Sequence, residues 1–366
     1  LGKFEKAIDN FKQVITLSPR GSLTDRSYFQ IAESYGKLES FDQSLNYLDR
    51  LIRRYDFSAM SEKELIEMAS MKLKGLVEET SRELVAKAQL KRGDIFAQRG
   101  EVDNALAAYA VVPEKYPMEV ALVQNAYIRS AELVSRERGV DAALIAYQNA
   151  IENVDDKRFQ ARTQLTIARL LFEKESFAAA AEQYNIFLEA YGDVATRIGF
   201  SEDKVLFRIS QCHQALMRSH LVEERANEAQ DSFFSAMKLY ERILNEHADS
   251  ELLPDVFFSR GYALQLQKDE RASDDYARMV ADYPEHPAAP NALLQLARID
   301  LEAGNYSKAG SVYQRLIETY PESTPVNPAR MELGLCFKNT GDLSKAIASF
   351  ESIDPEWNQW AKVQRR

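Results

Sequence analysis

Apolar residues recur three and four positions apart along almost the whole chain. On a helix this spacing places them on one face, which can pack against a neighbouring element. No segment shows the alternation of apolar and polar residues that is typical of a half-buried strand. The pattern predicts an all-α protein.

The helical pattern itself repeats, most clearly near the C-terminus. Ala297 is followed 37 positions later by Gly334, and Tyr313 by Phe350; four further pairs have the same offset. Small residues such as Ala309 and Gly334 occur where two helix backbones approach closely, because a larger side chain would force them apart. The sequence therefore predicts an array of repeated helical units.

Local signals predict where the helices of each unit end. Gly304 and Gly341 are predicted to end the first helix, because glycine adopts a left-handed conformation at the least cost. The next residue, Asn305 or Asp342, has a side chain able to cap the second helix. Prolines are predicted to stop the second helix, because proline cannot continue it. These prolines are Pro117, Pro284 and Pro321.

The same positions recur upstream. The aromatic residue or leucine of the second helix falls at Phe11, Leu48, Tyr109, Tyr147, Tyr184, Tyr276, Tyr313 and Phe350. Together with the small residues and the closing prolines, these positions resemble the tetratricopeptide repeat family. The resemblance covers essentially the whole chain. It implies an α-α superhelix, a solenoid of about eight helix-turn-helix repeats plus a half repeat, in which each repeat is a pair of antiparallel helices, A and B.

The spacing of the repeats also predicts the domain organisation. We expect a single array over residues 1–366, with insertions near 58–81 and 216–232. The first insertion is predicted to form an added helix from Ser61 to Thr80. The second is polar and favours helix, so the helices around it are predicted to be extended or joined by a projecting loop; both insertions are equally consistent with tolerated surface additions. The unpaired helix at each end predicts that the chain is part of a longer protein.

Composition and charge narrow the class of function. Hydrophobic residues make up 45% of the chain and charged residues 28%, which excludes wholesale disorder. The formal net charge is −10, and the sequence has no cluster of Lys and Arg with interleaved aromatic residues. Nucleic-acid binding needs such a basic surface and is not expected. The longest apolar run, Ala105 to Val112, is far too short to predict a transmembrane helix.

The sequence also has no pattern typical of catalysis or metal binding. Cys212 and Cys336 lack the close spacing of a metal or redox pair and are predicted to be buried core residues. His213 and His220 could share a helix face, but two imidazoles without a third ligand make a poor metal site. Phosphate-binding loops and nucleophile-elbow motifs are absent from the sequence. We expect a protein that is not an enzyme and has no cofactor or metal.

The resemblance implies a binding groove on the inner wall of the superhelix, formed by residues three before and one after the small residue of each A helix. The candidate groove residues are Glu33, Asp94, Glu132, Phe258, Tyr262, Leu294, Arg298, Met331 and Leu335. The three acidic residues predict a preference for a basic stretch, whereas the others supply aromatic and aliphatic anchors with one cation. The apolar members can instead pack between the helices, and that alternative is the stronger of the two.

These observations predict a scaffold that binds a peptide or protein segment of unknown identity in its groove. The alternative is a structural module that packs against copies of itself or against flanking domains, which Trp357 and Trp360 favour. Residues 282–299 and 319–336 are similar in style to the repeats of bacterial envelope tetratricopeptide proteins. That style favours a bacterial protein of the periplasm or envelope and leaves a cytoplasmic location open.

Overall fold

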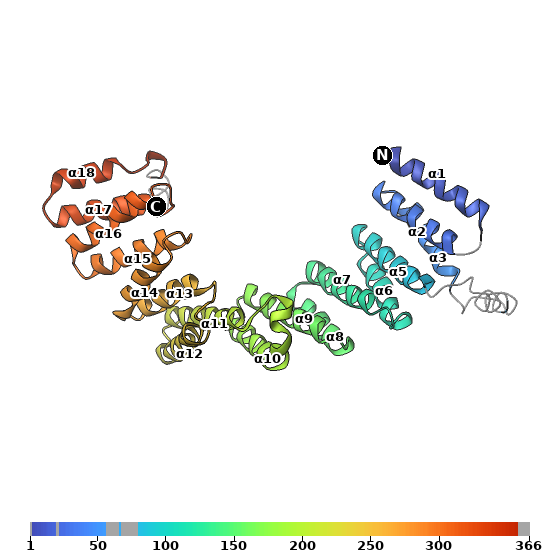
Figure 1. The fold of residues 1–366 in the computed structure, drawn as a ribbon, viewed down its shortest axis with the longest axis horizontal. Coiled ribbons are helices and arrows are strands. Elements are labelled where there is room, and N and C mark those ends of the chain that lie inside the picture. Colours follow the sequence, from blue (N-terminus) through green and yellow to red (C-terminus); the bar gives the residue numbers. More distant parts are fainter. Residues whose placement is uncertain (1, 20–21, 56–65, 67–79, 358–366) are drawn as a thin grey trace. The chain divides into compact units, whose positions relative to one another are not determined.

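The structure is a computed structural model that describes residues 2–19, 22–55, 66 and 80–357. Within these residues the regular elements are helices, and no strand is present, which confirms the all-α prediction. The chain divides into two compact units, Leu1–Lys174 and Glu175–Arg366, called unit 1 and unit 2 below. Figure 1 shows the helices in chain order.

The helices of unit 1 pack in consecutive pairs, α2 with α3, α5 with α6, and α7 with α8. The first helix of a pair is helix A and the second is helix B; α1 precedes the first pair as a half repeat. The bounds are α1 (Gly2–Leu17), α2 (Ser22–Lys37), α3 (Phe41–Arg53), α5 (Thr80–Gln98), α6 (Val102–Lys115), α7 (Val120–Arg138), α8 (Val140–Asn153) and α9 (Lys157–Glu173).

The helices of unit 2 pair in the same way, α11 with α12, α13 with α14, α15 with α16, and α17 with α18. The bounds are α10 (Phe177–Ala195), η2 (Thr196–Ile198), α11 (Glu202–Val222), α12 (Ala226–Glu246), α13 (Leu253–Leu266), α14 (Arg271–Asp282), α15 (Ala289–Glu302), α16 (Tyr306–Thr319), α17 (Val326–Asn339) and α18 (Leu343–Glu351). The predicted fold of helix-turn-helix repeats with a leading half repeat is confirmed.

Each turn from helix A to helix B contains one residue with a positive φ angle. The residues are Glu39, Gly100, Gly139, Glu175, Glu224, Lys268, Gly304 and Gly341. In most of these turns the next N–H bonds to a carbonyl five residues back; Asn305 N, for example, donates to Asp300 O at 2.8 Å. This is the Schellman arrangement, which satisfies carbonyls that the helix end leaves open. The predicted roles of Gly304 and Gly341 are confirmed.

The predicted side-chain caps are confirmed at one of the two positions. Asp342 accepts a hydrogen bond from Lys345 N at 3.2 Å and caps α18. The Asn305 side chain makes no capping bond, although its backbone N–H takes part in the turn as that of Asp342 does. The B helices α6, α14 and α16 end just before Pro117, Pro284 and Pro321, as predicted.

An aromatic ring of helix B lies directly over the small residue of helix A. A Cβ atom added to Gly334 would meet the Phe350 ring at 2.5 Å, and one added to Gly261 would meet the Tyr276 ring at 3.1 Å. Such distances leave no room for a side chain at Gly334 and very little at Gly261. The small residue is therefore required by the ring of the partner helix as well as by the approach of two backbones.

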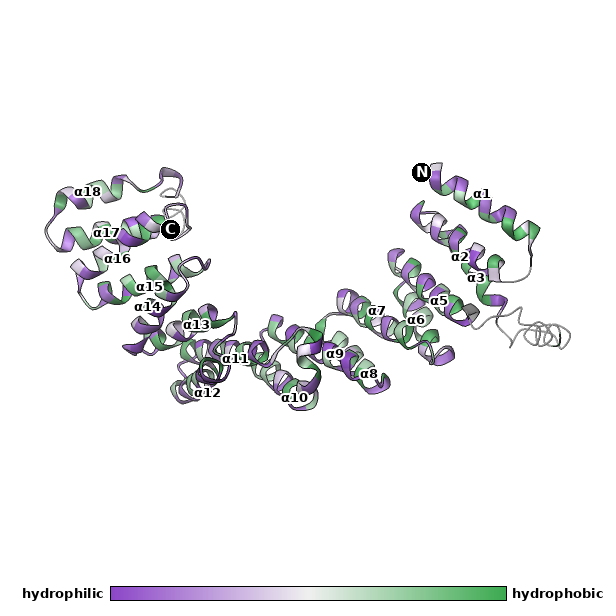
Figure 2. Cartoon of the chain, viewed as in Figure 1, coloured by the Kyte–Doolittle hydropathy of each residue, from purple (hydrophilic) through white to green (hydrophobic). Residues whose placement is uncertain are grey.

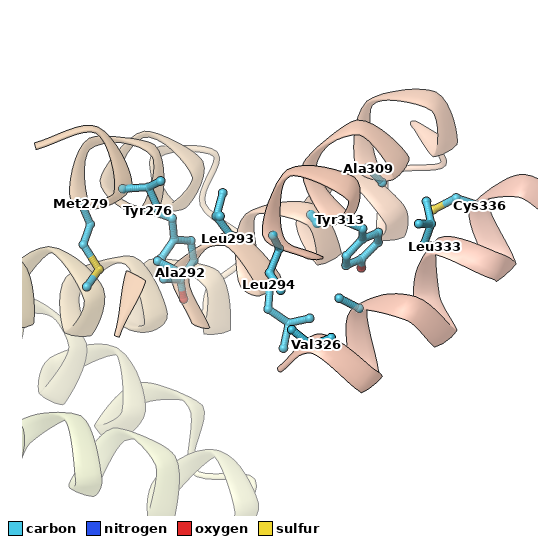
Figure 3. Close-up of a cluster of buried hydrophobic side chains, with 14 of the residues drawn as sticks. Tyr276, Met279, Ala292, Leu293, Leu294, Ala309, Tyr313, Val326, Leu333 and Cys336 are labelled. Carbon is cyan, nitrogen blue, oxygen red and sulfur yellow. The ribbon is translucent and has the colours of Figure 1, made fainter. Parts of the chain in front are cut away.

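The core is shared between neighbouring repeats. Figure 3 shows Leu293 and Leu294 of α15, Tyr313 of α16 and Leu333 of α17 within one buried cluster. Figure 2 shows hydrophobic and hydrophilic positions alternating around the helices, which is the amphipathic pattern that the sequence predicts. Because each helix pair buries its apolar face against the next pair, stability depends on the contacts between repeats.

The two predicted insertions have different outcomes. Most of the first, near 58–81, lies outside the described residues, including the predicted helix start at Ser61. At the second, α11 and α12 are each 21 residues long, compared with 14 for α15 and α16. Only residues 223–225 separate α11 from α12. The insertion therefore extends both helices, and a projecting loop, which was the other expectation, is not formed.

The first prediction tests the assigned repeat positions. Ala309→Leu adds three carbon atoms at a fully buried position of α16 and should lower the free energy of unfolding by about 1–3 kcal/mol through overpacking. Ala226→Leu changes an exposed position of α12 and should alter it by less than about 0.5 kcal/mol. Chemical denaturation of both variants measures the difference, and a larger loss at Ala226 would contradict the assignment.

Candidate functional site

In the described part of the chain, three pairs of successive A helices are in close contact, and no pair of successive B helices is in equally close contact. The A helices α2, α5 and α7 of unit 1 are in contact in succession, as are α11 and α13 of unit 2. Polar side chains on neighbouring A helices also bond to each other. We call the surface on which these side chains meet the inner face.

On the inner face of unit 2, Arg298 of α15 forms an ion pair with Glu332 of α17. Arg298 Nε lies 3.0 Å from both carboxylate oxygens of Glu332, and Nη2 lies 2.6 Å from Oε1. The Tyr313 hydroxyl of α16 donates to Glu332 Oε2 at 2.6 Å. Because Glu332 is buried, these bonds fix its carboxylate between three helices of two repeats.

These surroundings raise the pKa of both donors, Arg298 and Tyr313. The hydrogen bond to Glu332 raises the pKa of Arg298. Burial, together with the hydrogen bond to the Glu332 carboxylate, raises the pKa of Tyr313. Both side chains, Arg298 and Tyr313, therefore keep their protons at neutral pH.

Neutral side chains make an equivalent connection elsewhere in unit 2. The Tyr276 hydroxyl of α14 donates to Gln265 Oε1 of α13 at 2.8 Å. Gln265 Nε2 in turn donates to Gln295 Oε1 of α15 at 3.3 Å. One repeat earlier, the corresponding groups are Tyr240, Gln214 and the backbone carbonyl of Ser259.

Unit 1 contains the arrangement with its charges exchanged. Asp94 of α5 accepts from the Tyr109 hydroxyl of α6 at 2.9 Å and from Arg129 of α7 at 2.5 Å. Here the acid lies on the earlier A helix and the cation on the later one, the reverse of Arg298 and Glu332. Burial is the main cause that raises the pKa of Tyr109, and the Asp94 charge adds to it. In both units a B-helix tyrosine thus joins a polar bridge between consecutive A helices.

Three of the predicted groove residues have roles other than the expected ones. Leu294 is only 6% exposed and belongs to the core, so the packing alternative holds at this position. Arg298 is not a free cation, because Glu332 neutralises it. Asp94 is likewise paired with Arg129 and does not offer an unpaired carboxylate to a basic partner.

The remaining predicted residues are accessible to different degrees. Leu335 is 38% exposed, and Tyr262 and Met331 are half-buried. Phe258 is also half-buried and packs against the core. Of the other acidic residues, Glu132 is exposed, whereas Glu33 is half-buried and accepts from Gln30 Nε2 at 3.2 Å.

The sequence prediction missed the partners that close these bridges. Glu332 and Arg129 lie two residues before the small residue of their A helices, a position that was not considered part of the inner wall. The sequence does contain a signal for them. Arg298 and Asp94 directly follow the small residue of their A helices, and in each case the residue two before the small residue of the next A helix, Glu332 or Arg129, has the opposite charge. Gln265 has no such signal, because a glutamine at a helix surface is unremarkable.

The groups that could carry other chemistry are poorly placed for it. Cys212 and Cys336 are buried, and burial raises the pKa of Cys212 to about 12 and that of Cys336 to about 11, so both thiols stay protonated. Burial lowers the pKa of His213 and favours its neutral form. Across the described residues, no three His, Cys, Asp or Glu side chains are grouped as metal ligands. None of the helices described is long and apolar enough to cross a membrane.

Stacked helix pairs with a shared core and a bridged inner face define the class of α-helical repeat solenoids. Three segments, residues 26–58, 87–117 and 291–323, match the tetratricopeptide repeat family. The chain contains tetratricopeptide repeats at these three places, as its sequence predicts. Repeats of this family imply a protein–protein interaction scaffold, and the family is generally non-catalytic.

Solved structures are similar to this chain in fold. The C-terminal part of a TPR repeat-containing protein from Cytophaga hutchinsonii matches 73% of this chain and 95% of its own length, with 16% identity and a TM-score of 0.50. A tetratricopeptide repeat protein from Parabacteroides merdae matches 73% of this chain and 91% of its own, with 14% identity and a TM-score of 0.41. A comparison with curated proteins gave no match.

The second prediction concerns the Arg298–Glu332 bridge. Arg298→Met leaves the Glu332 carboxylate buried with one remaining donor, Tyr313, and should lower the free energy of unfolding by about 1–3 kcal/mol. Arg169→Met removes the exposed pair with Glu173 and should change it by less than about 0.5 kcal/mol. Denaturant unfolding of the two variants compares them; equal losses would show that the bridge contributes no more than a surface ion pair.

Proposed function

We propose that this scaffold holds an apolar segment of a partner protein against the inner face of unit 2. The contact surface consists of Phe258 and Tyr262 on α13 and Met331 and Leu335 on α17. Each pair is four residues apart on its helix, so its two side chains point to the same side. No chemical step is part of the proposal.

The observation that carries the proposal is the contrast between charged and apolar groups on this face. Arg298 and Glu332 neutralise each other, and Gln265 is engaged by Tyr276 and Gln295. The aromatic side chain of Tyr262 and the apolar side chain of Leu335 retain accessible surface. A partner therefore gains more by burying apolar and aromatic surface than by forming ion pairs there. On this basis, binding depends weakly on salt.

The third prediction tests this surface with crosslinking. A benzophenone amino acid placed at Tyr262 or at Leu335 should crosslink to one and the same partner protein in extracts of the source organism, as judged by mass spectrometry. Leu221 at the end of α11 is 40% exposed, close to the 38% of Leu335, and is the matched control position. Leu335→Asp should abolish the crosslink formed at Tyr262, whereas Leu221→Asp should preserve it. Crosslinks of equal yield at all three positions contradict the proposal.

A second candidate function, self-association or packing against a flanking domain, has its own supporting observation. Leu343, Ile347 and Phe350 of α18 are 63%, 57% and 36% exposed. In α16 the position that corresponds to Ile347 is Gly310, which is buried beside Leu333 and Cys336 of α17. An apolar helix face of this kind favours burial against another surface.

The fourth prediction separates this candidate from the first. If α18 joins copies of the chain, the sedimentation coefficient should rise with protein concentration, and Ile347→Glu should remove that rise. Ile145→Glu, at a position of α8 that is 74% exposed, should leave the concentration dependence unchanged. A monomer at all concentrations rules out self-association and leaves the contact proposed for unit 2 unaffected.

A further inference from the structure

In unit 1, α1, α2 and α5 form an open apolar groove of about 330 Å³. Phe11 and Val14 of α1, Leu23 and Phe29 of α2 and Leu84 of α5 form its walls. The volume is at the lower end of the roughly 300–1,000 Å³ that small-ligand pockets span. The groove is therefore large enough for one or two apolar side chains and too small for a whole helix.

The groove has a single charged group at its edge. Arg26 is exposed and is the one ionisable side chain among the residues that line the groove. In the described part of the chain it has no ion-pair partner, whereas its neighbour Asp25 is buried and bound by Arg54 at 2.8 Å. The other polar lining groups have bonds of their own: Ser27 Oγ donates to Leu23 O at 2.7 Å and Gln30 Nε2 donates to Glu33.

We infer that this groove binds a peptide segment in which a large apolar side chain is followed by a carboxylate. The apolar side chain enters between Phe11, Phe29 and Leu84, and the carboxylate pairs with Arg26 at the edge. Arginine beside an apolar recess frequently contributes strongly to binding at protein interfaces. Its guanidinium group can form two hydrogen bonds to one carboxylate, and its methylene groups cover apolar surface. This surface is separate from the one proposed for unit 2 and does not depend on it.

The groove also changes the expected charge of a partner that binds the first repeats. Glu33, Asp94 and Glu132 predicted a preference for basic partners, but none of them lines the groove. The free charge at the apolar recess is positive. The partner chemistry of this surface is therefore acidic and apolar.

The test uses three fluorescein-labelled peptides, Gly-Ser-Leu-Phe-X-Ser-Gly, in which X is Asp, Asn or Lys, and measures fluorescence anisotropy with the whole chain. The Asp peptide should bind tightest, about three- to fivefold tighter than the Lys peptide, as expected for one partly exposed ion pair. Arg26→Glu should reverse that order, and Leu23→Ser should weaken all three peptides. Leu23 is 60% exposed, and neither substitution removes a buried contact of the core.

Matched controls separate the groove from general charge effects. Arg162→Glu changes an exposed arginine of α9, and Ile145→Ser an exposed apolar residue of α8; both should leave the three affinities unchanged. An unchanged peptide preference in Arg26→Glu, or a reversal in Arg162→Glu as well, overturns the inference. Failure of the parent chain to bind the Asp peptide more tightly than the Lys peptide overturns it too.

Discussion

The packing of a B-helix aromatic ring onto a small A-helix residue is the contact on which the rest of the repeat depends. Where the ring of Phe350 or Tyr276 lies over Gly334 or Gly261, the backbones of the two helices can approach closely. The ring also fills the space between the helices of its own repeat. Tyr276 and Tyr313 are fully buried for this reason and belong to the core that neighbouring repeats share.

The position of the ring determines which polar groups of the inner face the tyrosine hydroxyl can reach. A tyrosine packed in this way places its hydroxyl beside the A helices. There it can donate a hydrogen bond to a carboxylate that is shielded from water and requires a donor. Tyr313 bonds to Glu332 and Tyr109 to Asp94, and each carboxylate also binds an arginine of another A helix. These two carboxylates of the inner face thus connect neighbouring repeats. The partner contacts proposed above use apolar groups such as Leu335 and the edge charge of Arg26.

The sequence predicted the helices and their ends because those depend on short-range rules. Gly304 ends α15 and Pro321 follows α16, and both effects involve only a few neighbouring residues. The left-handed Glu39 and Lys268 were not predicted, because no glycine marks their turns. The roles of Arg298 and Asp94 could not be read from one helix, since their partners lie on the next A helix.

The candidate site was predicted less well than the fold for a general reason. Spacing along a helix shows which side chains share a face, but whether a residue such as Leu294 is covered depends on the neighbouring repeat.

The contact between ring and glycine is best tested by comparing Gly93→Ala with Gly192→Ala in denaturant unfolding. Gly192 has open space around it, so Gly192→Ala should raise the free energy of unfolding by about 0.5–1 kcal/mol, the usual gain when alanine replaces glycine in a helix. Gly93 lies against the Tyr109 ring, so its substitution should lower the free energy of unfolding by about 1–3 kcal/mol; a gain equal to that at Gly192 would contradict the account.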